Sequence, residues 1–130
     1  MRRVLLRGKK YDKELRERIK NGYTINWYVI SKYKPLSMRC IREFQDKVSW
    51  FYISANQNLS EDFIREFQDK VDWDGISEFQ ILSEDFIEEF MNELDLGIIK
   101  ERTIYGKYFK KLLSLEFIES LIIMKELTAS

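Results

Sequence analysis

Residues 59–73 read LSEDFIREFQDKVDW, and near copies of this stretch occur on either side of it at a fixed period of 23 residues. In register, the three copies run over residues 27–48, 50–71 and 73–94. Six columns align in all of them: Trp27/Trp50/Trp73, Ile30/Ile53/Ile76, Ser31/Ser54/Ser77, Leu36/Leu59/Leu82, Ile41/Ile64/Ile87 and Phe44/Phe67/Phe90. A fixed period of roughly 20 to 50 residues is typical of stacked repeat proteins, so this stretch indicates the fold.

The second half of each copy has the apolar spacing of a helix. In the middle copy, apolar residues recur at every fourth position: Leu59, Phe63, Phe67 and Val71. This stripe predicts a long helix within 59–71 that buries one face. Ser60 precedes it as an N-cap, and the carboxylates of Glu61 and Asp62 lie in its first turn, where they oppose the positive end of the helix dipole.

A shorter apolar segment separates successive long helices, with apolar positions three residues apart, as in residues 72–80. The column in front of it holds residues that favour N-caps: Asn26, Ser49 and Asp72. We therefore predict a second helix of about one to two turns in each copy. Pro35 ends the first of these, because a residue that precedes proline leaves the α region. Neither helix can bury its apolar face alone, so the copies are expected to pack side by side.

The two ends of the chain carry diverged versions of the same pattern. Residues 1–24 form a basic N-terminal cap with a helix that ends at Gly22, and residues 25–94 contain the three 23-residue repeats. Residues 95–130 contain a fourth short helix, an insertion and a last helix over 114–127. This last helix is apolar on more than one face, so it either closes the array or offers a surface to another chain. The predicted fold is all-α, a short solenoid of about five short-helix/long-helix repeats with divergent caps.

Composition excludes several kinds of chemistry. The chain has no histidine and one cysteine, so it has no Ser-His-Asp or Cys-His site and no ordinary zinc site. We predict that Cys40, which shares a column with Phe63 and Phe86, is a buried apolar residue, and that the protein is not an enzyme and needs no cofactor. No apolar run is long enough to cross a membrane, and the basic start MRRVLLRGKK lacks the apolar stretch of a secretory signal. These features predict an intracellular, cytoplasmic protein.

The aligned columns read Trp-x-x-Ile-Ser and, further on, LSEDFIREF in the best-preserved copy. This pattern resembles the short WxxIS…LSEDFIREF-type repeats that recur, often in many copies, in proteins of large DNA viruses and of some phages. The match covers residues 27–94, is nearly complete over 59–74 and weakens toward both ends. The resemblance implies a viral or phage origin, the cytoplasm of the host cell as location, and a binding scaffold; it carries over no catalytic residue.

Columns that differ between the copies point to a binding surface, since the outward positions of a solenoid are free to diverge. The divergent columns are Tyr28/Phe51/Asp74, Val29/Tyr52/Gly75 and Tyr33/Asn56/Phe79. Aromatic residues are frequent in them, as they are at the energetic centres of protein interfaces. The candidate partner-binding residues are therefore Tyr28, Tyr33, Phe51, Tyr52, Asp74 and Phe79. The alternative is that some of these rings complete the core between repeats.

Acidic side chains are concentrated in residues 60–95, which hold two basic and thirteen acidic groups, a net charge of −11. A metal site on Glu84, Asp85, Glu88 and Glu89 is disfavoured, because a solvated cluster in a first helical turn lacks a fixed cage of oxygen ligands. Contact with a protein partner is favoured, through Glu61, Asp62, Glu84, Asp85 and Glu88. In this hypothesis the protein binds or inhibits a host protein, such as an antiviral defence nuclease whose nucleic-acid channel the acidic segment occupies.

Basic side chains are concentrated at the N-terminus, where residues 1–23 hold nine basic and three acidic groups, a net charge of +6. Together with nearby aromatic residues they support an alternative, in which the chain binds single-stranded nucleic acid by phosphate attraction and base stacking. The cations assigned to it are Arg2, Arg3, Arg7, Lys9 and Lys10. Against this alternative, the sequence has no RNA-binding motif, and its isoelectric point of about 6.4 is not that of a nucleic-acid-binding domain. Neither hypothesis predicts an oligomeric state.

Overall fold

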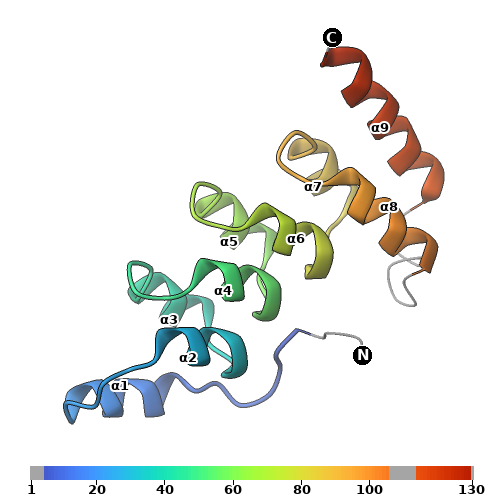
Figure 1. Ribbon diagram of the computed structural model, residues 1–130. Helices are drawn as coiled ribbons and strands as arrows, with labels where there is room; N and C mark the ends of the chain where they lie inside the picture. The colour runs from blue at the N-terminus through green and yellow to red at the C-terminus, as the bar shows by residue number, and fades with distance from the viewer. Residues whose placement is uncertain (1–4, 106–113, 130) are drawn as a thin grey trace. The chain divides into compact units, whose positions relative to one another are not determined.

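Every regular element in the part of the chain that the structure describes is an α-helix (Figure 1). The computed structural model describes residues 5–105 and 114–129. The helices there are α1 (Asp12–Lys20), α2 (Trp27–Tyr33), α3 (Met38–Glu43), α4 (Trp50–Asn56), α5 (Glu61–Glu66), α6 (Trp73–Phe79), α7 (Glu84–Glu89), α8 (Leu96–Tyr105) and α9 (Leu115–Thr128). In the same residues, the only strand-like contact is an isolated parallel bridge between Leu6 and Gln57. The predicted all-α fold is confirmed.

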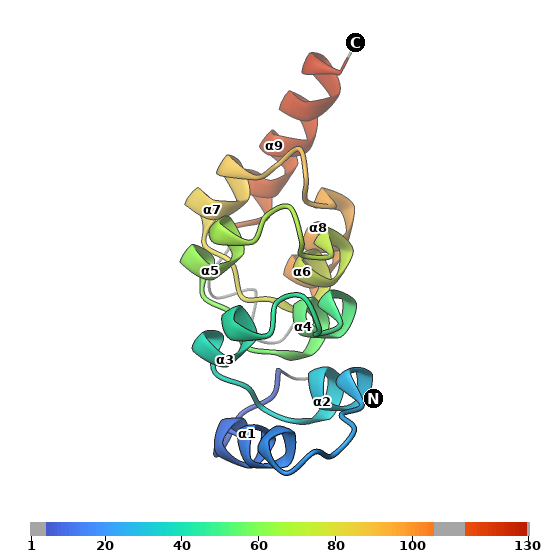
Figure 2. The ribbon, with the colours of Figure 1, turned by 90° about the vertical axis from the view of Figure 1, so that its left-hand side faces the viewer.

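The helices belong to two compact units, Met1–Asp72 and Trp73–Ser130, called here the first and the second unit. In the first unit, α1, α3 and α5 form one row and α2 and α4 form another, in which α2 packs against α4 (Figures 1 and 2). In the second unit, α8 packs against both α6 and α9. The boundary between the units falls between two of the 23-residue copies.

The serines that precede α3, α5 and α7 are N-caps. The Oγ atoms of Ser37, Ser60 and Ser83 accept hydrogen bonds from the backbone N–H three residues further on, at 3.0, 3.1 and 3.2 Å. Each cap satisfies an N–H that the first turn of a helix leaves unpaired. In α5 and α7 two carboxylates follow the cap in the first turn, as the Ser-Glu-Asp pattern predicts.

These helices are shorter than the sequence predicts. The expected long helix within 59–71 is α5, which has six residues and ends at Glu66, with Phe67 as its C-cap. Phe67 and Val71 are nevertheless buried, because a tight turn continues the chain along the same face. In this turn the N–H groups of Lys70 and Val71 both donate to the carbonyl oxygen of Phe67, at 2.9 and 3.0 Å. The prediction of short and long helices is therefore wrong, although the buried residues are those it named.

Side chains take the carbonyl oxygens that a longer helix would use. Gln68 Nε2 donates to the carbonyl oxygen of Arg65, and Gln45 Nε2 donates to that of Arg42, both at 3.0 Å. In an uninterrupted α-helix each of these oxygens would accept from the backbone N–H four residues further on. These side-chain hydrogen bonds accompany the turn but are not required for it, because α7 ends at the equivalent residue with Met91 in the column of Gln45 and Gln68. Apolar spacing could not reveal the turn, since a longer helix and the turn would bury the same side chains.

Two contacts recur in every copy. Each tryptophan packs on a phenylalanine of its own copy, with ring centroids 5.2 Å apart in the pairs Trp27–Phe44, Trp50–Phe67 and Trp73–Phe90. The aligned serines Ser31, Ser54 and Ser77 are fully buried. Their Oγ atoms accept hydrogen bonds from the backbone N–H 18 residues further on, at 3.0, 2.8 and 2.9 Å. The serine column is thus a buried acceptor that ties each copy to a later segment.

The first helix is closed by a left-handed glycine. After α1, Gly22 has φ +79°, and the N–H groups of Gly22 and Tyr23 donate to the carbonyl oxygens of Ile19 and Arg18 at 3.1 and 3.0 Å. This is the Schellman arrangement, in which a residue without a Cβ satisfies the last carbonyls of a helix. The helix ends where the sequence predicts.

The last helix also matches its predicted range. It follows Ser114, whose Oγ accepts from the N–H of Phe117 at 3.0 Å. It buries Ile118 and Leu121 and leaves four apolar side chains exposed: Leu115, Ile123, Met124 and Leu127. The predicted insertion before it spans residues 103–110, of which residues 106–110 lie outside the described residues. None of the helices in the described ranges has both the length and the apolar character needed to cross a membrane.

Candidate functional site

Four of the predicted partner-binding aromatic residues come together on α2 and α4, and we call Tyr28, Tyr33, Phe51 and Tyr52 the aromatic cluster. The Tyr52 ring meets Tyr28 and Phe51 edge-on, with centroids 6.2 and 5.1 Å apart. Lys32 Nζ lies 5.0 Å from the Tyr33 centroid and 5.2 Å from the Tyr52 centroid. A cation over a ring face is attracted by the ring quadrupole, so Lys32 joins the two parts of the cluster.

The aromatic cluster is open to solvent. The side chains of Tyr28, Tyr33 and Phe51 are 68, 59 and 57% exposed. The isoleucine and serine columns in the middle of α2 and α4 are buried instead, and Tyr28, Tyr33 and Phe51 lie outside this buried face. The alternative in which these three rings complete the core is therefore wrong.

The segment before α1 brings further cations to the edge of the cluster. Its backbone is held at both ends: Leu6 N–H donates to the carbonyl oxygen of Asn56 at 2.7 Å, and Tyr11 N–H donates to that of Pro35 at 2.8 Å. Residues 7–10 therefore run past the C-terminal ends of α4 and α2 (Figure 1). The exposed cations at this edge are Arg7, Lys9, Lys10 and Lys34. Together with Lys32 and the aromatic cluster they form what we call the aromatic-cationic face.

No carboxylate belongs to the segments that form this face. Residues 5–11, 24–42 and 47–60 contain neither aspartate nor glutamate. The first unit has sixteen basic and ten acidic side chains, a net charge of +6, and the second has six and twelve, a net charge of −6. The neutral total therefore combines a cationic unit with an anionic one, and the isoelectric point of the whole chain describes neither.

Of the other residues of the divergent columns, Val29 is 43% exposed on α2, and the rest are buried or lie in the second unit. Asp74 and Phe79 are on α6 in the second unit, the first exposed and the second half-buried, and they are not part of the aromatic cluster. Gly75 is buried, and Asn56 is 7% exposed, with its Nδ2 donating to the carbonyl oxygen of Lys32 at 3.0 Å. The prediction that these columns face solvent is wrong at Gly75. It is also wrong at Asn56, because the Asn56 side chain closes the C-terminal end of α2.

The predicted acidic contacts are divided between the two units. Glu61 and Asp62 begin α5 in the first unit, whereas Glu84, Asp85 and Glu88 lie in α7 of the second. Asp62 pairs with Arg65 of its own helix at 2.9 Å and is 95% exposed. Across residues 5–105 and 114–129, no group of three or more acidic or cysteine side chains is arranged to hold a metal ion. These carboxylates do not form one site within a unit.

Ion pairs connect the helices of the row that holds α1, α3 and α5. Arg16 donates to Glu43 at 3.0 Å, and Arg42 donates to both carboxylate oxygens of Glu66 at 2.8 Å. The hydrogen bonds from Arg42 lower the pKa of Glu66. This row therefore carries paired charges of both signs, in contrast to the face on α2 and α4.

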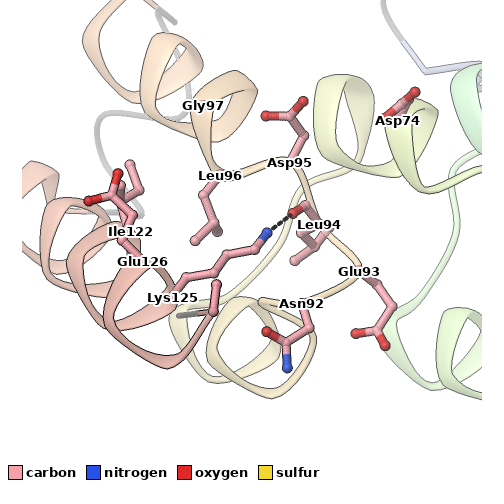
Figure 3. Close-up of a pocket in the computed structure, with 11 residues that line it drawn as sticks. Asp74, Asn92, Glu93, Leu94, Asp95, Leu96, Gly97, Ile122, Lys125 and Glu126 are labelled. Atoms are coloured by element: carbon pink, nitrogen blue, oxygen red, sulfur yellow. Dashed lines mark hydrogen bonds between the residues drawn. The ribbon is translucent and has the colours of Figure 1, made fainter.

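A shallow hollow of about 630 Å³ lies in the second unit, between the turn after α7 and α9 (Figure 3). Lys125 reaches across it, and its Nζ donates to the carbonyl oxygen of Leu94 at 3.2 Å. In Figure 3 the carboxylates of Glu93 and Asp95 point away from this ammonium group. The contact helps to attach α9 to the turn, and the lining offers no convergent set of polar groups for a small ligand.

Two groups with large pKa shifts lie away from the aromatic-cationic face. Burial raises the pKa of the Cys40 thiol to about 12, and the residue is fully buried, as its apolar column predicts. Arg102 is half-buried, and desolvation lowers its pKa to about 10, while its Nη1 donates to the carbonyl oxygen of Ser77 at 2.7 Å. Neither side chain contributes to the face.

No known protein family, curated protein or solved structure matches this chain. Fold and site together define an all-α protein with repeated helix pairs and an exposed aromatic-cationic face on its first unit. Sequence reasoning found the rings but missed Lys32 and Lys34, and the lack of carboxylates in residues 24–42 is the signal that could have found them. Of the predicted N-terminal cations, Arg2 and Arg3 lie outside the described residues.

Proposed function

We propose that this protein is a non-enzymatic helical-repeat module that binds a macromolecular partner through the aromatic-cationic face. One observation carries the proposal: Tyr28, Tyr33 and Phe51 are more than half exposed, in a cluster whose Tyr33 and Tyr52 rings contact Lys32 and whose segments hold no carboxylate. Transfer of a large ring out of water lowers the free energy, and large rings are the side chains that contribute most to binding at interfaces. Burial in a complex would therefore stabilise this cluster.

The proposed scaffold is a short solenoid of about five helix pairs. The equal ring distance of 5.2 Å in the three Trp–Phe pairs supports it, as does the serine contact that each copy repeats. In a solenoid the buried columns stay constant while the outward columns diverge, which is how α2 and α4 would carry different rings on the same backbone.

Two kinds of partner remain from the sequence hypotheses. A host or viral protein would bury the rings at the centre of an interface, and a nucleic acid would use rings and cations together. Inhibition of a defence nuclease by the acidic segment stays a prediction, and the arrangement of the carboxylates adds no support because they are divided between two units. The proposal rests on the face of the first unit.

A capture experiment tests the proposed face. The wild type and the double variant Tyr28→Ala/Phe51→Ala are immobilised and exposed to the same cell lysate, with and without nuclease treatment, and the bound proteins and nucleic acids are identified. The variant is expected to lose the main species that the wild type binds, because it removes two exposed anchors and opens no buried cavity. The matched control is Tyr105→Ala, which removes a ring that is 78% exposed in the second unit. Equal capture by the wild type and the double variant would contradict the proposal.

A further inference from the structure

We infer that the ligand of the aromatic-cationic face is single-stranded nucleic acid. The inference rests on the proposed function, which assigns this face as the binding surface, and it adds the chemistry of the ligand. Single strands are held by rings on which bases stack and by cations that neutralise phosphates. Both occur here within one set of neighbouring segments, and the whole-chain isoelectric point that argued against this ligand does not describe the first unit.

The rings of Tyr28 and Phe51 can accept stacked bases. They meet Tyr52 at interplanar angles of 82 and 81°, and an edge-on contact covers at most one face of a ring. Their exposed fractions of 68 and 57% fit rings with an open face. Every nucleobase has a π face, so stacking on such rings does not depend on base sequence.

The cations lie on the side of the cluster that holds Tyr33 and Tyr52, at the C-terminal ends of α2 and α4, whereas Tyr28 and Phe51 lie in the first turns of these helices. Lys32 is between Tyr33 and Tyr52, and residues 7–10 cross the C-terminal ends of the same two helices. The described part of the chain gives no carboxylate partner to any of the five cations: Arg7, Lys9, Lys10, Lys32 and Lys34. They are therefore available to replace the counterions of a polyanion.

An acidic peptide or a duplex fits the face less well. Ring faces are electronegative, so the carboxylates of an acidic peptide would gain from the cations and not from the rings. A duplex presents phosphates but keeps its bases stacked inside, so the exposed rings would find no free base. Only an unpaired strand uses both halves of the face.

Fluorescence anisotropy with the full chain and a fluorescein-labelled oligothymidylate of about 20 nucleotides tests the inference. The expected Kd is on the order of 1–100 µM near physiological salt. The expected slope of log K against log salt is about −2 to −3.5, because three to five phosphate contacts contribute roughly 0.7 each. Duplex DNA and poly-L-glutamate, added as competitors, should each bind the protein more weakly than the oligothymidylate by about tenfold or more.

Variants locate the binding on the face. Tyr28→Ala and Phe51→Ala should each weaken binding by at least about fivefold, which is the low end for one base stacked on one ring. Lys32→Gln/Lys34→Gln should make the salt slope shallower by about 1.4. The charge-matched control is Lys20→Gln/Lys47→Gln, which changes two exposed lysines, one at the end of α1 and one after α3. The ring control is Tyr105→Ala. Controls should bind within about twofold of the wild type, and circular dichroism verifies that every variant is folded.

Each contrary result has a defined meaning. An intact protein that does not bind the oligonucleotide, or variants that bind no more weakly than their controls, would overturn the inference. Poly-L-glutamate that competes as well as the oligonucleotide would also overturn it, since the face would then not distinguish a nucleic acid from another polyanion. If Tyr28→Ala/Phe51→Ala still loses a captured protein in the lysate experiment, the proposed function survives these outcomes. Unchanged capture would contradict the proposed function as well.

Discussion

Replacement of Gln57 by alanine is expected to lower the free energy of unfolding of the first unit by about 3 kcal/mol. Gln57 is 1% exposed and follows α4, and its amide group binds the backbone around Pro35. Its Nε2 donates to the carbonyl oxygens of Ser31 and Lys34 at 3.0 and 2.7 Å. Its Oε1 accepts from the N–H of Leu36 at 3.0 Å. One side chain thus joins the end of α4 to the turn between α2 and α3.

The magnitude follows from these three hydrogen bonds. Each contributes about 1 kcal/mol net, and a buried backbone group that loses its partner costs about 1–3 kcal/mol. The space left by the amide adds a cavity term, so about 3 kcal/mol is the lower end of the expected loss. For a unit the size of Met1–Asp72 the loss corresponds to a fall in Tm of roughly 12–24 °C.

Urea unfolding followed by tryptophan fluorescence and circular dichroism measures this loss. Gln57→Glu extends the test, because it keeps the shape and replaces the donor with an oxygen that faces two carbonyl oxygens. Its destabilisation should exceed that of alanine at neutral pH and shrink as the pH falls, since a protonated carboxyl group regains one donor. The control is Asn58→Ala, an exposed amide side chain for which we expect less than about 0.5 kcal/mol. If Gln57→Ala moves the urea midpoint no further than Asn58→Ala, these hydrogen bonds do not hold α4 to α2.

Three further changes test the local structure. Ser60→Ala should lower the free energy of unfolding by about 1 kcal/mol, because the Ser60 Oγ caps α5. Ser49→Ala should lower it by less than about 0.5 kcal/mol, because the Ser49 side chain makes no cap hydrogen bond. Equal losses in urea unfolding would argue against the assigned caps. Gly22→Ala should cost about 1 kcal/mol, since φ +79° is unfavourable for a residue with a Cβ, and an unchanged midpoint would contradict the left-handed helix end. The buried Cys40 thiol, with its pKa raised to about 12, should resist iodoacetamide until the protein unfolds, and rapid labelling of the folded protein would disprove its burial. Above the usual thiol pKa of 9.0 the wild type should lose stability relative to Cys40→Ala, because only the unfolded thiol ionises there.

Helix starts could be predicted from the sequence, but the ends of α3 and α5 could not. A serine cap acts on an N–H three residues away, so the start of α5 is a local property that Ser60 reveals. α5 and α7 end at equivalent residues, although Gln68 donates to the carbonyl oxygen of Arg65 and Met91 in the same column cannot donate, so this hydrogen bond does not decide between a longer helix and a turn. Apolar spacing is the same in both cases, and so it predicted a long helix where a short helix and a turn occur.

The candidate site was predicted in part for a similar reason. Divergence between aligned copies identified Tyr28, Phe51 and Tyr52, because a repeated backbone places equivalent positions on equivalent faces. The same argument placed Asp74 with them, although it lies in the second unit. It also placed Asn56 on the surface, although a hydrogen bond to Lys32 draws it inward. Alignment shows which positions are equivalent, and it does not show which neighbours each position meets.

The sequence by itself determined the all-helical fold, the 23-residue period and most of the buried columns, because residue spacing decides which side chains share a helix face. Only the tertiary structure decided how the aromatic-cationic face is composed. Leu6 and Tyr11 form backbone hydrogen bonds with Asn56 and Pro35, which are 50 and 24 residues away along the chain. These bonds place residues 7–10 at the C-terminal ends of α2 and α4. Backbone groups carry no sequence signal of their own, so no pattern of side chains announces such a pairing.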